Sequence, residues 1–166
     1  MTHAMPSTGR LLGVDYGAKR VGLAISDRDR RLASPHAIHH RNHAIGDARF
    51  FTGLVREEGI VGMVVGLPVH ASGQEGQKAR EAKAYGAWLA STTGLPVVFW
   101  DERFTTVEAE RQLLDAGLTK KRRLARLDMV AAQILLQTYL NAGCPADTEA
   151  RALDDLAQER PTGVGG

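Results

Sequence analysis

The stretch LLGVDYGAKRVGLAISD, residues 11–27, holds two short apolar segments on either side of a turn at Gly17. Both segments are rich in residues that favour strands, and the glycine between them favours a tight connection. We therefore predict two antiparallel strands joined by a hairpin. Asp15 is the unexpected residue, because a charged group inside an otherwise buried segment costs free energy unless it is paired or bound.

The residues after the hairpin extend it into a meander. RLASPHAIHH, residues 31–40, has the composition of a third strand that follows after a short polar turn. Apolar residues at helical spacing then predict a helix over 44–58, and Gly59 is placed to end it.

The second half of the chain alternates strands and helices. Apolar runs at 60–68 and 96–102 predict two strands separated by a helix over 75–91, which implies parallel neighbours joined by a right-handed crossover. Helices are expected at 105–117 and 127–140. The order βββαβαβαα predicts an α/β fold with a mixed five-stranded sheet, an antiparallel meander followed by parallel strands, flanked by helices.

Length and composition favour a single soluble domain. The 166 residues suffice for one core, which we place at residues 10–144, between a flexible N-terminus (1–9) and a mobile C-terminal tail (145–166). The chain has one cysteine, so no intrachain disulfide or cysteine-based zinc site is expected. No apolar run has the length of a membrane span or signal core, and we expect a cytoplasmic protein without a membrane partner.

Charge is unevenly distributed along the chain. The net charge is +2, and the predicted tail carries five acidic residues against two arginines. The remainder of the chain therefore carries +5. A basic body of this kind suits a polyanionic partner such as a nucleic acid.

Three carboxylates stand at the ends of predicted elements. Asp15 ends the first strand, Glu102 ends the last strand, and Asp128 begins the last helix. In open sheets with parallel strands, active sites form at the carboxyl ends of those strands. Asp128 shares a helical face with the small residues Ala131 and Ala132, so this helix can approach the sheet closely and complete a triad.

A triad of acids predicts a divalent metal. Clustered carboxylates repel one another unless a cation neutralises them, and Mg²⁺ or Mn²⁺ prefers such oxygen ligands. Metal-assisted phosphodiester hydrolysis follows as the reaction class, with either one or two ions. Taken singly, Asp15 could instead support the turn, Glu102 could pair with Arg103, and Asp128 could cap its helix. Their convergence on one sheet edge favours the catalytic interpretation.

Cationic side chains occur next to each predicted acid. They can contact nucleic-acid phosphates, which would make binding depend strongly on salt, or they can simply be solvated. These candidate nucleic-acid-binding residues are Lys19, Arg20, Arg103, Lys120, Lys121, Arg122, Arg123 and Arg126.

Two further stretches have weaker signals. HASGQEG, residues 70–76, lies between a strand and a helix, where it could bind an anion or form an ordinary turn. HAIHHRNH, residues 36–43, holds four of the six histidines. We see no carboxylate at helical spacing within it, and we therefore expect solvated histidines at a strand edge and loop rather than a metal site.

Four blocks of sequence together resemble the pre-16S rRNA nuclease (YqgF) family of Holliday-junction-resolvase-like proteins, which has an RNase H-like fold. The blocks are GVDYGAKRVGLAISD, VVGLPVHASGQEGQKAR, DERFTTVEAERQLL and LDMVAAQILLQTYL, and the resemblance covers about residues 10–141. It implies a metal-dependent nuclease, with Asp15, Glu102 and Asp128 as catalytic residues and metal ligands.

The resemblance also implies a substrate and a compartment. The family is thought to trim the 5′ end of precursor 16S ribosomal RNA in the bacterial cytoplasm, so precursor RNA and pre-ribosomal particles are the expected partners. In one respect this chain departs from the wider resolvase group, which carries an acid at the end of the fourth strand, where this chain has VVGLPVH. Glu102, at the end of the next strand, would then take that place.

Other functions stay open at this stage. The chain could be a Holliday-junction DNA resolvase, or a non-catalytic RNA-binding factor in ribosome maturation. The hairpin also resembles the phosphate-binding hairpin of actin-like and sugar-kinase-like ATPases, but 166 residues leave no room for their second lobe. Monomer and dimer both fit the sequence.

Overall fold

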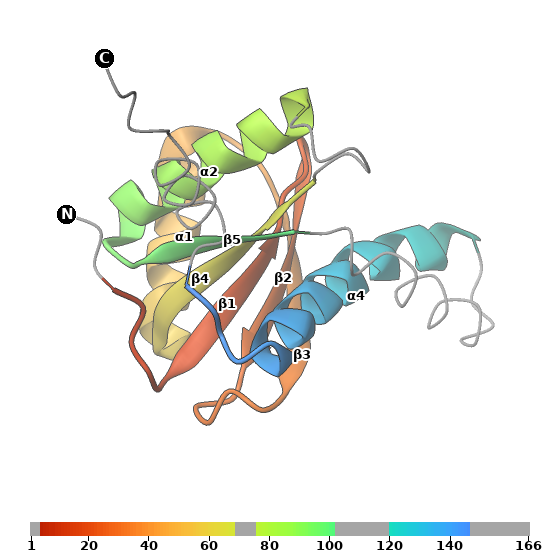
Figure 1. Cartoon of the computed structure of the whole chain (residues 1–166). Helices are drawn as coiled ribbons and strands as arrows, with labels where there is room; N and C mark the ends of the chain where they lie inside the picture. The colour runs from red at the N-terminus through yellow and green to blue at the C-terminus, as the bar shows by residue number, and fades with distance from the viewer. Residues whose placement is uncertain (1–3, 69–75, 102–119, 147–166) are drawn as a thin grey trace, which may run out of the picture.

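The computed structural model describes residues 4–68, 76–101 and 120–146, and for residues 120–128 it describes the backbone alone. Its centre is a five-stranded sheet with the order β3-β2-β1-β4-β5 (Figure 1). The strands are β1 (Arg10–Asp15), β2 (Arg20–Ser26), β3 (Ala33–His40), β4 (Ile60–Leu67) and β5 (Val97–Asp101).

The sheet is mixed, as predicted. β1 and β3 pair antiparallel with β2, whereas β4 pairs parallel with β1 and β5 pairs parallel with β4. The carboxyl ends of β1, β4 and β5 therefore lie at one edge of the sheet, which is where we predicted a site.

Helices cover both faces of this sheet. α1 (Ala44–Glu58) and α2 (Gln77–Thr93) lie on one face, and α4 (Lys120–Asn141) crosses the other (Figure 1). Gly59 follows α1 with a φ of 64°, the left-handed conformation expected of a glycine that ends a helix. The helix predicted at 105–117 lies outside the described residues.

Side chains of β1, β4 and β5 alternate between two cores. In β1, Leu12 and Val14 are buried beneath α1 and α2, whereas Leu11 is buried against α4 together with Leu136. Neighbouring residues of a strand point to opposite faces, and because both faces of β1 are covered, its sequence is a continuous apolar run.

The last helix begins earlier than we predicted. α4 starts at Lys120 rather than near Leu127, so Asp128 lies inside the helix and the prediction that it begins or caps α4 was wrong. Lysine, arginine, leucine and alanine are all good helix formers, and no glycine or proline interrupts residues 120–126. The apolar periodicity detected the part of the helix that packs on the sheet, and the charged first turns carry no such signal.

Candidate functional site

Asp15 lies at the carboxyl end of β1, on the face of the sheet that α4 covers. It is the last residue of β1, pairs in register with Gly22 of β2, and is partly buried. By the alternation of the strand it shares the α4 face with Leu11 and Gly13. The predicted strand-end carboxylate is thus confirmed in position.

Gly13 lets α4 approach β1 closely. A Cβ atom built on Gly13 would come within 2.8 Å of Cβ of Leu136 and 3.1 Å of the carbonyl oxygen of Ala132. Leu11, two residues earlier in β1, packs in one cluster with Tyr139 and Leu140, which lie later in α4. β1 and α4 therefore run in opposite directions where they pack against each other.

This antiparallel relation bears on Asp128. Asp15 lies two residues after Gly13, and Asp128 lies four residues, about one helical turn, before Ala132. Both positions thus lie in the same direction from the point of contact between β1 and α4. The side chain of Asp128 is not among those that the structure describes.

The sequence has two consecutive acids, Asp101 and Glu102, and β5 ends at the first of them. Asp101 is its last residue and pairs in register with Leu67 of β4, whereas Glu102 lies outside the described residues. Val98 and Trp100 pack on the α4 side, and Val97 and Phe99 pack on the side of α1 and α2. Asp101 therefore belongs to the face opposite Asp15.

Within the described residues, no group of three or more histidine, cysteine, aspartate or glutamate side chains is arranged to hold a metal ion. Two of the three predicted ligands, Glu102 and Asp128, fall outside that search. The assignment of the triad with Asp15 stays a prediction. The same holds for Arg103 and for the side chains of Lys120, Lys121, Arg122, Arg123 and Arg126, although α4 carries the backbone of the last five.

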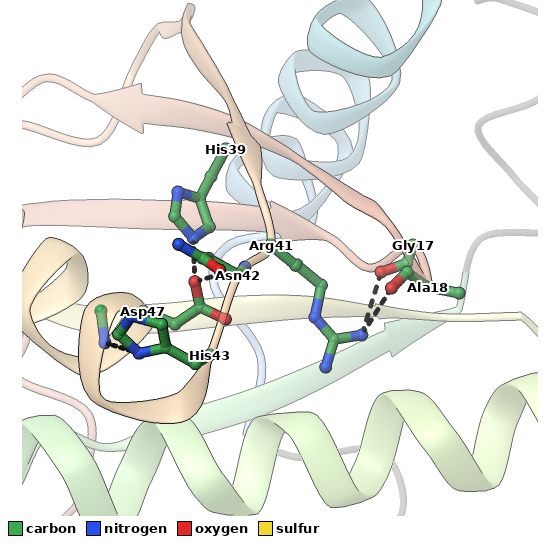
Figure 2. A network of polar contacts seen from close by, with 8 residues as sticks. Gly17, Ala18, His39, Arg41, Asn42, His43 and Asp47 are labelled. Carbon is green, nitrogen blue, oxygen red and sulfur yellow. Dashed lines mark hydrogen bonds and ion pairs between the residues drawn. The ribbon is translucent and has the colours of Figure 1, made fainter.

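The turn from β1 to β2 is held by an arginine that sequence reasoning passed over. Arg41 donates from one terminal nitrogen to the carbonyl oxygens of Gly17 (3.3 Å) and Ala18 (3.1 Å) (Figure 2). The same nitrogen donates to the hydroxyl of Tyr16 (3.2 Å). Gly17 is required in this turn, since a Cβ there would fall 2.2 Å from the carbonyl oxygen of Arg20. Arg41 thus fixes the loop that follows Asp15.

The histidine-rich run is more structured than we predicted. Nε2 of His39 lies 2.8 Å from Oδ1 of Asp47, and the two side chains are only 11% and 7% exposed. The ring of His39 also stacks on Phe50, with centroids 4.0 Å apart. Nδ1 of His43 accepts from the backbone N–H of Gly46 and caps α1.

The prediction of solvated histidines was therefore wrong for His39 and incomplete for His43. The physical reason is Asp47, which lies four residues after His43 in the first turn of α1 and turns back toward β3 (Figure 2). The run itself contains no carboxylate, as stated above, and Asp47 lies four residues beyond its end.

Asp47 is ionised at neutral pH. Burial of its carboxyl group alone would raise the pKa, but the hydrogen bonds from the Asn42 N–H and from His39, together with the nearby Arg41 charge, hold the pKa below the usual 3.8. Oδ1 accepts the Asn42 N–H at 3.0 Å. Asp47 therefore anchors the segment that carries Arg41.

Two hollows adjoin this turn. The first, here called the basic depression, has a volume of about 710 Å³ and is lined by Gly17, Ala18, Lys19, Arg20, His40, Arg41 and Asn42. The second, here called the aromatic cavity, has a volume of about 400 Å³ and is lined by Tyr16, Arg41, Asn42, Ala44, Asp47, Glu81, Ala84, Tyr85 and Trp88. Arg41 and Asn42 line both of them, so the two hollows are neighbours.

The basic depression gathers part of the predicted cationic set. Lys19 and Arg20, which we expected in the turn, both line it, although Arg20 is already the first residue of β2. Arg41 adds a third cation that is distant in sequence. The depression begins at Gly17, two residues after the predicted catalytic residue Asp15.

A family model described as RuvX, Holliday junction resolvase, matches residues 9–142. The chain belongs to this family. Membership makes it a hydrolase of phosphodiester bonds, and it confirms the resemblance inferred from the four sequence blocks. The matched range covers every element of the sheet and α4.

Curated relatives agree with the family over most of the chain. A protein of Rhodopirellula baltica named "Putative pre-16S rRNA nuclease" is 47% identical over 137 residues, which cover 82% of this chain and 79% of that protein. A protein of Paracoccus denitrificans with the same name is 41% identical, covering 83% of this chain and 87% of its own.

The fold is shared with a solved resolvase. The structure titled "T. thermophilus RuvC in complex with Holliday junction substrate" aligns with a TM-score of 0.51 at 16% identity, covering 81% of this chain and 95% of that chain. The predicted RNase H-like fold is thereby confirmed. No helix in the described part of the chain is long and apolar enough to cross a membrane.

Proposed function

We propose that this protein is a metal-dependent nuclease that processes the 5′ end of precursor 16S ribosomal RNA. Membership of the family supports phosphodiester hydrolysis, and the names of the two relatives support the RNA substrate. The proposed setting is the cytoplasm, where precursor RNA or pre-ribosomal particles are the partners.

The observation that carries this proposal is the closeness of β1 and α4. Gly13 and Ala132 meet with no room for a side chain between them, and the carboxylate positions Asp15 and Asp128 lie beyond that contact in the same direction. For the third acid we propose Glu102 rather than Asp101, because Asp101 belongs to the opposite face of the sheet.

The donor set fits a hard divalent cation. Carboxylate oxygens at the carboxyl edge of a sheet are the ligands that Mg²⁺ and Mn²⁺ prefer, and Asp15, Glu102 and Asp128 would hold such an ion. When bound, the ion would supply an activated water and neutralise charge on the phosphate. Asp15 would be fixed for this task by the β1 ladder, while Arg41 holds the next loop in place.

Phosphates on either side of the cleaved bond would meet cations of this chain. Lys19, Arg20 and Arg41 line the basic depression, and Arg103 with the lysines and arginines of the first turns of α4 would extend this surface. Such contacts position a strand without reading its sequence. We propose that they set the register of the substrate over Asp15.

The proposal is tested by cleavage of a precursor 16S RNA fragment that carries its 5′ leader. We expect cleavage with Mg²⁺ or Mn²⁺, no cleavage after removal of divalent ions by EDTA, and recovery when Mg²⁺ is restored, because three carboxylates need a counter-charge to work together. The measurement is the rate of appearance of the shortened RNA on a denaturing gel.

A second substrate decides between two nuclease functions. The family description favours a Holliday junction as the alternative, so a four-way DNA junction is assayed under the same conditions. Faster cleavage of the junction than of the RNA would replace the proposed substrate. Tight RNA binding without cleavage of either substrate would indicate a non-catalytic maturation factor.

The basic depression predicts a specific dependence on salt. Replacement of Lys19, an exposed cation in the depression, by alanine should weaken RNA binding and reduce the slope of log K against log salt by about 1. Anisotropy titrations at several salt concentrations measure this slope. Arg28→Ala is the matched control, since Arg28 is an exposed cation in the turn at the other end of β2, and its slope should equal that of the wild type. Equal slopes for Lys19→Ala and Arg28→Ala would show that the depression does not contribute to RNA binding.

A further inference from the structure

The aromatic cavity contains polar atoms that the described part of the protein leaves unsatisfied. Nε of Arg41 and the hydroxyl of Tyr85 are buried, and neither has a hydrogen-bond partner within the residues that the structure describes. Tyr85 is only 6% exposed. Buried polar groups are normally paired, so two orphaned groups lining one cavity indicate a bound ligand that supplies the partners.

The walls of the cavity are suited to a flat ring. Trp88 is partly exposed and stacks on Tyr85, with ring centroids 5.5 Å apart and planes inclined by 27°. The Arg41 guanidinium lies 4.9 Å from the centroid of Tyr85 and 5.3 Å from that of Tyr16. Aromatic rings and arginine planes are the surfaces on which nucleobases stack in proteins that bind single strands.

The polar groups of the cavity include both donors and acceptors. Arg41 Nε donates, the Tyr85 hydroxyl can donate or accept, and burial raises the pKa of Tyr85, which keeps the hydroxyl protonated. Glu81 lines the same wall and accepts from Tyr16, 3.4 Å away. A base edge, which carries donors and acceptors side by side, matches this set better than a purely anionic or purely apolar ligand does.

The position of the cavity connects it to the proposed site of cleavage. Asp15 and Tyr16 are consecutive residues, and the strand alternation places them on opposite faces at the same sheet edge. The basic depression begins at Gly17 and borders the aromatic cavity at Arg41 and Asn42, which line both. A strand whose phosphates lie in the depression would thus have a base within reach of the cavity.

We infer that the aromatic cavity is a subsite for one unpaired nucleotide, whose base stacks beside Trp88 and bonds to Arg41 and Tyr85 while its phosphate lies in the basic depression. The inference deepens the proposed nuclease function and rests on it for the identity of the strand. Under this inference the RNA substrate has an unpaired nucleotide next to the phosphodiester bond that is cleaved. The volume of about 400 Å³ is at the small end of the range for small-ligand pockets, which suits a single base.

The test measures binding in EDTA, so that cleavage plays no part. The probe is a fluorescein-labelled single-stranded hexauridylate, and its anisotropy gives the dissociation constant for the full-length protein. Trp88→Ala should weaken binding about tenfold, because a stacking surface is lost. Tyr85→Phe should weaken it about fivefold, because one hydrogen bond to the base is lost while the ring stays.

Two features of the design separate binding from folding. Tyr85→Phe removes an oxygen that has no described partner, so the variant should resist urea at least as well as the wild type while it binds less tightly. Trp100→Phe is the matched control, since Trp100 lies on the α4 face, where it bonds to Thr138, and its dissociation constant should equal that of the wild type. In that control protein Trp88 is the sole tryptophan, and the hexauridylate should quench its fluorescence.

Specific results would overturn the inference. Unchanged hexauridylate binding in both Trp88→Ala and Tyr85→Phe would exclude the cavity as a subsite. Equal affinity for uridine 5′-monophosphate and for hexauridylate would indicate a free nucleotide instead of a strand. Binding that depends on Trp88, without cleavage of any substrate, would refute the proposed nuclease function and support the subsite. Cleavage of RNA, with binding that Trp88→Ala leaves unchanged, would support the nuclease function and refute the subsite.

Discussion

Replacing Asp15 by asparagine is expected to lower the rate of RNA cleavage by about 10³-fold, since a metal ion contributes several kcal/mol and its binding depends on this charge. The substitution keeps the shape of the side chain at the end of β1 and removes the negative charge. The measurement is a single-turnover cleavage assay of the precursor RNA fragment with Mg²⁺ at saturating protein. Binding of the same RNA in EDTA should stay close to that of the wild type.

The matched control for this experiment is Asp29→Asn. Asp29 is an exposed carboxylate in the turn between β2 and β3, at the opposite end of β2 from Gly22, the partner of Asp15. Its substitution should leave the cleavage rate unchanged. Equal cleavage by wild type and Asp15→Asn would refute the catalytic role of Asp15, and with it the interpretation of the whole sheet edge.

The arrangement of the sheet followed from the sequence because strands and helices leave periodic signals. The short apolar segment before the turn at Gly17 predicted β1, and Gly59 marked the end of α1. The apolar run at 60–68 predicted β4 in the same way. These features are local in the chain, and each depends on a few neighbouring residues.

The candidate site was predictable only where it is local. Asp15 stood out because it interrupts a strand, whereas the role of Arg41 comes from contacts to residues 23 to 25 positions away. The sequence around Arg41 carries no pattern that predicts its contacts with the turn after β1. Likewise, Tyr85 and Trp88 occur in α2 at ordinary helical spacing. The cavity forms where Tyr16, the residue after β1, packs against Tyr85.

The histidine run shows the same limit in another form. His39 was expected in water because the run was placed at a strand edge and loop, but the first two turns of α1 bring Asp47 and Phe50 against it. A polar residue on an edge strand is solvated only if no other element covers it. Whether α1 covers β3 depends on where the helix packs on the sheet. The residues of β3 alone do not determine that position.

Replacement of Asp47 by alanine is expected to lower the free energy of unfolding by about 3 kcal/mol, because it leaves buried partners without their acceptor. Asp47 is 5% exposed, and its Oδ1 accepts from both His39 and the Asn42 N–H. Urea unfolding at pH 7 measures the change. Asp29→Ala, which removes an exposed carboxylate, should unfold at the same urea concentration as the wild type.

The companion variant Asp47→Asn isolates the contribution of the charge. Because the pKa of Asp47 in the folded protein lies below its usual 3.8, ionised Asp47 stabilises the fold above that pH, and this stabilisation is lost as the pH falls through the lowered pKa. Wild type should therefore be more stable than Asp47→Asn at pH 7, and the difference should shrink as the pH falls from about 4 toward 2. The Asp27 carboxyl also has a lowered pKa, through hydrogen bonds from the Leu32 and Arg31 N–H groups, but it is common to both proteins and cancels in the comparison. A difference that stays constant over this range would show that the hydrogen bonds of Asp47, and not its charge, hold β3 to α1.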